Sequence, residues 1–113
     1  MFSRYENGQQ FNYHTDTISE YNQLECGGRL ASCLFYLNEG YVGGHTHFPE
    51  LNLSVAPRTG AALVWYNCEL PYTKGDMVPD TRLTHAGMPA GGGESTDLKK
   101  YAANKWVHAK AVR

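Results

Sequence analysis

Hydrophobic residues gather in short runs or alternate with polar ones, and no segment keeps the helical period of about 3.6 residues. The longest apolar run, residues 29–37, predicts a buried strand that ends at the turn signal Asn38-Glu39-Gly40. Residues 51–55 alternate strictly and predict a half-buried strand. Further strands are predicted at residues 61–66, 82–85 and 104–109.

Glycine-rich turns separate these segments, a spacing typical of a β-sandwich or barrel. A chain of 113 residues is long enough for one domain, so we expect residues 1–113 to form a single, mainly β domain. The polar segments 69–80 and 90–98 are rich in turn residues, and we expect them to be exposed loops that serve as lids.

Composition and charge exclude several classes of function. Ten Lys+Arg against eleven Asp+Glu give a formal net charge of -1, which provides no electrostatic case for a nucleic acid or an anionic membrane as partner. No apolar run approaches the roughly 20 residues that cross a bilayer. The amino terminus does not have the pattern of a secretory signal, and Cys26, Cys33 and Cys68 form no CxxC pair. We therefore expect reduced, buried thiols rather than disulfides, and a cytoplasmic location.

His14 and Asp16 are candidate metal ligands, because residues two apart on a strand face the same side. A nitrogen ligand from another strand would complete a set of two histidines and one carboxylate on one face of an octahedron. That set suits a non-haem Fe(II) that keeps positions open for substrate and oxygen. The candidates for the third ligand are His45, His47, His85 and His108.

Short motifs extend from residue 4 to residue 108, nearly the whole chain. In order they are Arg4-Tyr5-x-x-Gly8-Gln9-x-Phe11-x-x-His14-x-Asp16, Arg29-x-Ala31, Tyr36-Leu37-Asn38, Tyr41-x-Gly43-Gly44-x-Thr46-x-Phe48-Pro49, Val55-x-Pro57-x-x-Gly60-x-Ala62-Leu63, Trp65-x-Asn67, Asp80, His85-Ala86-Gly87-x-Pro89 and Asn104-Lys105-Trp106. This series resembles the prolyl 4-hydroxylase family of 2-oxoglutarate/Fe(II)-dependent dioxygenases. The resemblance implies a double-stranded β-helix, a jelly-roll-like barrel with iron at its open end.

The same resemblance implies the chemistry of the site. His14, Asp16 and His85 fall on the family's iron-ligand positions, and no catalytic residue is expected beyond these ligands. The family uses 2-oxoglutarate and O2, releases succinate and CO2, and hydroxylates a C–H bond. Ascorbate is implied as the agent that returns oxidised iron to Fe(II). A prolyl residue in a peptide or protein is the implied substrate.

Lys100 falls on the family's 2-oxoglutarate anchor when positions are counted back from Asn104-Lys105-Trp106, and Lys99 is the second choice. A buried carboxylate there requires a cation and hydroxyl donors. Tyr5 and Thr46 match the hydroxyl donors. The positions that line the family's substrate groove correspond to Arg29, Trp106 and His108.

The chain also departs from the family pattern. Phe11 stands where tyrosine is common, and Met88 replaces a frequent cysteine. The family's usual helix and strands before the first iron motif are missing, so we expect an N-terminally short domain. Unpaired edge strands would then invite association with another chain.

Two alternatives remain open at this point. His45, His47, Glu50 and His85 resemble the metal ligands of cupins, which share the barrel architecture. The second alternative is a truncated barrel that binds without turnover. A complete set of metal ligands argues against this second alternative, whereas the short amino terminus favours it.

Overall fold

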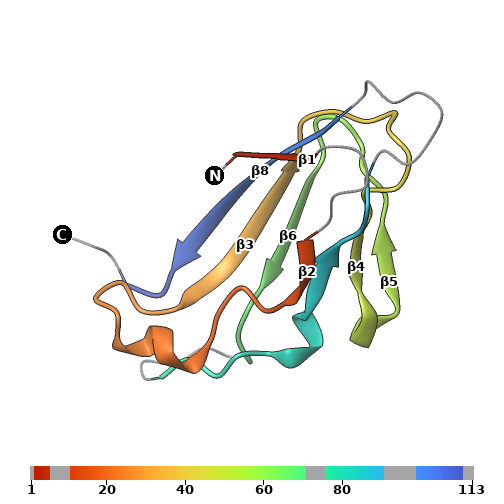
Figure 1. Ribbon diagram of the computed structural model, residues 1–113. Coiled ribbons are helices and arrows are strands. Elements are labelled where there is room, and N and C mark those ends of the chain that lie inside the picture. Colours follow the sequence, from red (N-terminus) through yellow and green to blue (C-terminus); the bar gives the residue numbers. More distant parts are fainter. Residues whose placement is uncertain (1, 6–10, 71–75, 91–98, 111–113) are drawn as a thin grey trace.

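The computed structural model describes residues 2–5, 11–70, 76–90 and 99–110, with residues 2–5 described by their backbone only (Figure 1). Its strands form two four-stranded antiparallel sheets. The large sheet has the order β1 (Phe2–Tyr5), β8 (Lys100–His108), β3 (Arg29–Tyr36), β6 (Ala62–Tyr66). The small sheet has the order β2 (Phe11–His14), β7 (His85–Gly87), β4 (Thr46–Phe48), β5 (Leu53–Val55).

The core lies between the two sheets, because strands of both contribute to one cluster of buried side chains. This cluster contains Leu34, Tyr36, Phe48, Trp65 and Ala102. Phe48 comes from β4 of the small sheet, and its ring packs edge-on against Trp65 of β6 with centroids 5.3 Å apart. The described strands thus form a jelly-roll-like arrangement of two facing, open sheets rather than a closed barrel (Figure 1).

Strand alternation divides the large sheet into a buried and an exposed face. On β3, Ser32, Leu34 and Tyr36 are buried, whereas Phe35 between them is 39% exposed. The exposed face continues onto β6 and β8 and is rich in large apolar side chains. These are Phe35, Val64, Tyr66, Tyr101 and Val107.

The predicted strands 29–37, 51–55 and 61–66 are confirmed as β3, β5 and β6, each shortened at one end. The prediction of a strand at residues 82–85 was wrong, because residues Thr81–Leu83 form a 3-10 turn (η3) and β7 begins at His85. The Asp80 carboxylate accepts the Arg82 N–H at 3.1 Å and so caps this turn. The strand predicted at 104–109 extends further toward the amino terminus, to Lys100.

Two more 3-10 turns, η1 (Ser19–Gln23) and η2 (Pro49–Leu51), follow β2 and β4. Residues 71–75 and 91–98 of the two predicted lids lie outside the described residues. All three cysteines are free thiols, but only Cys68 is buried, whereas Cys26 and Cys33 are half-buried, so the prediction of buried thiols was wrong for these two. In the described part of the chain, no helix has the length and apolar character needed to cross a membrane.

Candidate metal centre

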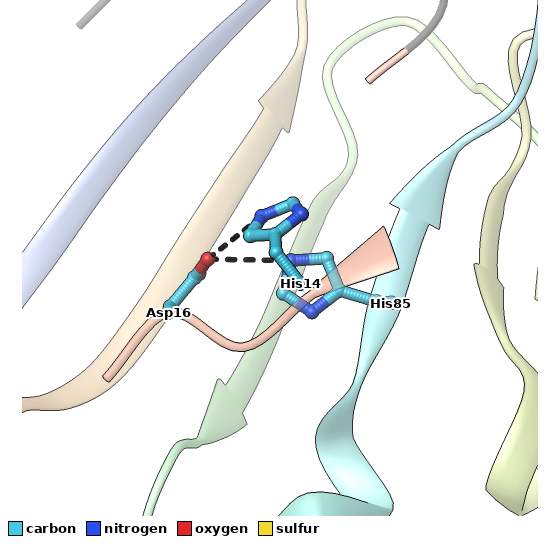
Figure 2. Close-up of side chains that lie close together, drawn as sticks. All are labelled: His14, Asp16 and His85. Carbon is cyan, nitrogen blue, oxygen red and sulfur yellow. Dashed lines mark ion pairs between the residues drawn. The ribbon is translucent and has the colours of Figure 1, made fainter. Parts of the chain in front are cut away.

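The two histidines of the predicted ligand set, His14 and His85, come together through strand pairing. His14 ends β2 and His85 begins β7, and the two are direct partners in the antiparallel register. Asp16 lies just beyond β2, so the turn after the strand, rather than strand alternation, brings it to the histidines. One ligand atom from each of the three residues lies within 4.8 Å of the others (Figure 2).

Each imidazole is oriented by a backbone carbonyl. Nδ1 of His14 lies 2.7 Å from the carbonyl of Asn12, and Nδ1 of His85 lies 2.8 Å from that of Leu83. A carbonyl only accepts, so Nδ1 of each ring carries the proton and donates it. The Nε2 atoms then face Asp16 Oδ1 at 3.1 Å and 3.4 Å (Figure 2).

This arrangement requires a cation between the rings and the carboxylate. Two Nε2 lone pairs that face one carboxylate oxygen are stable only if a proton or a metal ion lies between them. Burial would raise the pKa of Asp16, but hydrogen bonds from His14, His85 and Ser32 hold it well below its usual range. Burial would lower the pKa of His14, but its bonds to Asp16 and the Asn12 carbonyl raise it. Two imidazole nitrogens and a carboxylate oxygen fit the Fe(II) site expected from the sequence.

Aromatic rings fix His85 in the wall of the site. Its ring lies 4.8 Å from the Trp65 ring, 5.4 Å from the Phe48 ring and 4.4 Å from the His14 ring, measured between centroids. His85 is 5% exposed, so the core holds this ligand in place. His14 is more accessible, and the Phe11 ring packs edge-on against it at 4.4 Å.

Two residues to which the sequence assigned no role, Ser32 and Asn67, hold the second oxygen of Asp16. Ser32 Oγ donates to Asp16 Oδ2 at 2.5 Å, and Asn67 Nδ2 donates to Ser32 Oγ at 2.8 Å. The Trp106 indole N–H lies 3.4 Å from the same carboxylate oxygen. The sequence did offer a signal for Ser32, because it is a polar residue at an inward-facing position of the otherwise apolar strand β3.

A cavity of about 470 Å³ opens between the sheets beside the three candidate ligands. It is lined by Phe11, His14, Thr15, Asp16, Tyr21, Arg29, Leu34, Thr46, Trp65, His85, Gly87, Lys100, Ala102, Asn104 and Trp106. Strand β8 contributes every second residue from Lys100 to Trp106, because alternate side chains of a strand face the same side.

Lys100 is a buried cation in this cavity. It is 3% exposed, and its Nζ donates to the carbonyl of Gly44 at 2.9 Å. Burial lowers the pKa of Lys100 to about 8. Its neighbour Lys99 precedes the strand and is not among the residues that line the cavity; its carbonyl accepts a hydrogen bond from Asn38.

The two predicted hydroxyl donors belong to different sheets, Thr46 to β4 of the small sheet and Tyr5 to β1 of the large sheet. Thr46 is buried in the cavity wall, and its Oγ1 is 2.6 Å from the hydroxyl of Tyr36. Tyr5 pairs with Lys100 through the β1–β8 register, and the structure describes its backbone only.

The predicted substrate residues gather near the carboxyl-terminal end of β8, where Arg29 of β3 lies beside this strand. The Arg29 guanidinium stacks over the Trp106 ring, 3.9 Å from its centroid, and lies 5.8 Å from that of Tyr21. Arg29, Trp106 and Tyr21 all line the cavity. His108 is the β8 partner of Arg29, but it is exposed and does not line the cavity.

The cupin-type ligand set is not assembled among the described residues. His47 pairs with Ala86, the neighbour of His85, so alternation places it on the opposite face of the small sheet. There its Nδ1 lies 2.6 Å from the hydroxyl of Tyr13. The group of candidate metal ligands found in the described part of the chain is His14, Asp16 and His85.

Comparison with known proteins places this chain in a family. The family model described as the 2OG-Fe(II) oxygenase superfamily matches residues 1–108. The chain is 38% identical to prolyl 4-hydroxylase subunit alpha-1 of Gallus gallus over 84% of its length, and 34% identical to that of Homo sapiens over 96%. These matches cover 16% and 19% of the two relatives, so the chain spans well under half of their length.

A solved structure agrees with the fold. The viral collagen prolyl hydroxylase of Paramecium bursaria Chlorella virus-1, in its 2OG complex, superposes with a TM-score of 0.78. The two are 26% identical, and the match covers 97% of this chain and 57% of the viral protein.

Proposed function

This chain belongs to the 2OG-Fe(II) oxygenase superfamily, and we propose that it is the iron-binding part of a dioxygenase that hydroxylates prolyl residues in a peptide or protein. The observation that carries the proposal is one cavity that holds both a facial metal-ligand set and a buried lysine. The names of the relatives, two prolyl 4-hydroxylase alpha-1 subunits and a viral collagen prolyl hydroxylase, support the substrate class.

His14, Asp16 and His85 would hold the iron through two Nε2 atoms and a carboxylate oxygen. Bound Fe(II) would supply the redox chemistry that couples conversion of 2-oxoglutarate and O2 to succinate and CO2 with hydroxylation of a C–H bond, and ascorbate would keep it reduced. The protein's part is to fix three ligands on one side, which leaves the other coordination positions for substrates. The Asn12 and Leu83 carbonyls set the imidazole tautomers that this needs.

Lys100 would bind the far carboxylate of 2-oxoglutarate, with Thr46 and Tyr5 as hydroxyl donors. The cation lies in the wall of the same cavity as the metal ligands, and a charge-assisted hydrogen bond there contributes about 1.5–3 kcal/mol. Burial removes water from the Lys100 ammonium group and so lowers its pKa. A bound carboxylate would stabilise the charged form of Lys100 in place of that water.

Arg29 and Trp106, together with Tyr21, would receive the prolyl residue at the cavity mouth. A flat aromatic face beside a cation suits an apolar ring flanked by peptide carbonyls. His108 lies at the same end of β8 and would contact the flanking peptide.

The exposed apolar face of the large sheet, and the edge strands β1 and β6 that pair on one side only among the described residues, favour association with a further polypeptide. Edges with unpaired backbone groups add strands readily. Sedimentation velocity of the purified chain tests this association: a monomer at tens of micromolar would contradict it.

Anaerobic titration with Fe(II) and 2-oxoglutarate tests the metal and co-substrate assignments together. We expect a weak visible charge-transfer band that needs both additions and disappears in His14→Ala and in His85→Ala. The matched control is His47→Gln, which alters a histidine on the outer face of the small sheet and should leave the band unchanged. Loss of the band in His47→Gln alone would favour the cupin alternative.

Turnover tests the activity. With O2, ascorbate and a proline-rich peptide, we expect succinate release and a mass increase of one oxygen on the peptide. Lys100→Ala should raise the KM for 2-oxoglutarate and leave iron binding intact, whereas Lys99→Ala should change neither. A chelate band without succinate formation would favour a binding module without turnover.

A further inference from the structure

Two buried polar residues connect the Asp16 carboxylate to the large sheet. Ser32 and Asn67 are each 2% exposed, and they form the chain Asn67 Nδ2 to Ser32 Oγ to Asp16 Oδ2, with donor–acceptor distances of 2.8 Å and 2.5 Å. We call this pair the Asn67–Ser32 relay. The backbone of Asn67 is itself fixed, because its N–H donates to the Leu30 carbonyl and its carbonyl accepts from the Asp80 N–H.

The direction of the relay follows from the number of protons. A carboxylate that binds a metal ion only accepts hydrogen bonds, so the single hydroxyl proton of Ser32 is committed to Oδ2. Ser32 Oγ can then only accept from Asn67, which must present its amide NH₂ rather than its oxygen. The relay therefore ends on one particular oxygen of Asp16, the one that does not face the histidines.

We propose that Ser32 and Asn67 are positioning residues that keep Asp16 Oδ2 engaged with the protein, so that the carboxylate binds the metal through Oδ1 alone. Oδ1 is the oxygen that lies 3.1 Å and 3.4 Å from the two Nε2 atoms. A one-oxygen contact uses three coordination positions in all, whereas a two-oxygen contact would use a fourth and leave fewer for 2-oxoglutarate and O2. This inference rests on the proposed function.

The sheet register supports the same role. Ser32 pairs with Trp65 on one side and with Trp106 on the other, so the three residues form one row across the inner face of the large sheet. Trp65 packs against His85, and the Trp106 N–H lies 3.4 Å from Asp16 Oδ2. One row of the large sheet therefore contacts two of the three ligands, although none of the three ligands belongs to that sheet.

The test compares metal binding in matched variants of the full chain. Ser32→Ala removes the hydroxyl, and Asn67→Asp keeps the side-chain size but offers a carboxylate that competes for the Ser32 proton. We expect both to raise the Kd for Mn(II), measured without 2-oxoglutarate, by about 10- to 100-fold. Ser32→Thr retains a hydroxyl and should restore most of the affinity. Ser54→Ala, a change at an exposed serine of β5, is the control and should have no effect.

A second readout separates positioning from general stability. In the variants, the visible band formed with Fe(II) and 2-oxoglutarate should shift or weaken while circular dichroism stays unchanged. Wild-type Mn(II) affinity and an unshifted band in Ser32→Ala, or in Asn67→Asp if the alanine variant does not fold, would overturn the inference. If the wild-type chain binds Mn(II) but gives no band, the proposed function fails instead, and the Mn(II) comparison still decides the role of Ser32.

Discussion

Replacement of Lys100 by methionine separates what this buried cation costs the fold from what it does for 2-oxoglutarate. Lys100 is 3% exposed, and its Nζ donates to the Gly44 carbonyl at 2.9 Å. Burial lowers the pKa of Lys100 from 10.5 to about 8. Methionine has a similar length and no charge, so it should fill the same space while removing the ammonium group.

The size of the effect follows from the pKa change. One pKa unit corresponds to about 1.4 kcal/mol, so the buried charge of Lys100 costs the folded state about 3 kcal/mol. Between pH 8 and 10.5 the unfolded chain holds a proton that the folded chain has released, so stability rises with pH in this window. Below pH 8 the full penalty applies. Loss of the bond to Gly44 costs the variant about 1 kcal/mol.

We therefore expect Lys100→Met to raise the free energy of unfolding by about 2 kcal/mol at pH 7. This advantage should disappear as the pH approaches 10.5. Urea unfolding of the metal-free protein, followed by tryptophan fluorescence from pH 7 to 10, measures both proteins, with Lys99→Met as control. Wild-type and Lys100→Met stabilities that change in parallel across this range would refute the reasoning. At pH 7 the same variant should raise the KM for 2-oxoglutarate by about 10- to 100-fold.

Three further predictions concern the site and its support. Above pH 8 the wild-type KM for 2-oxoglutarate should rise about tenfold per pH unit, because the co-substrate needs protonated Lys100; a flat profile to pH 9.5 in steady-state assays would contradict this. Phe48→Ala, at a 2% exposed ring that packs on Trp65, should lower the free energy of unfolding by about 3–5 kcal/mol in urea titrations. Gly43→Ala should lower the melting temperature, since a Cβ at φ +73° would collide with the Pro89 carbonyl. An unchanged melting temperature would contradict this, because the loop would then have shifted to accommodate the Cβ without loss of stability.

The strands that the sequence predicted well are those whose inner residues are mostly apolar. β3 and β6 carry Leu34 and Trp65 into the core, and their runs were visible without a partner. The amino-terminal part of β8 was missed because its inner face carries Lys100, a charged residue that does not indicate a buried strand. The η3 turn was assigned as strand although Asp80, two residues before Arg82, offers a local capping signal.

The metal site was partly predictable. The spacing of His14 and Asp16 suggested two ligands, but residue reasoning left four histidines for the third position. The family resemblance pointed to His85, and the β2–β7 register pairs it with His14. His47 is excluded as the third ligand because its side chain lies on the opposite face of the small sheet, where it contacts Tyr13.

The sequence by itself determined the residue types of the site, a mainly β chain and the family to which it belongs. The tertiary structure alone decided which oxygen of Asp16 faces the histidines and which is tied to Ser32. It also decided that Lys100, rather than Lys99, lines the cavity. The physical reason is that strand register and sheet packing set these contacts, and they join residues far apart in the chain whose spacing no local pattern records.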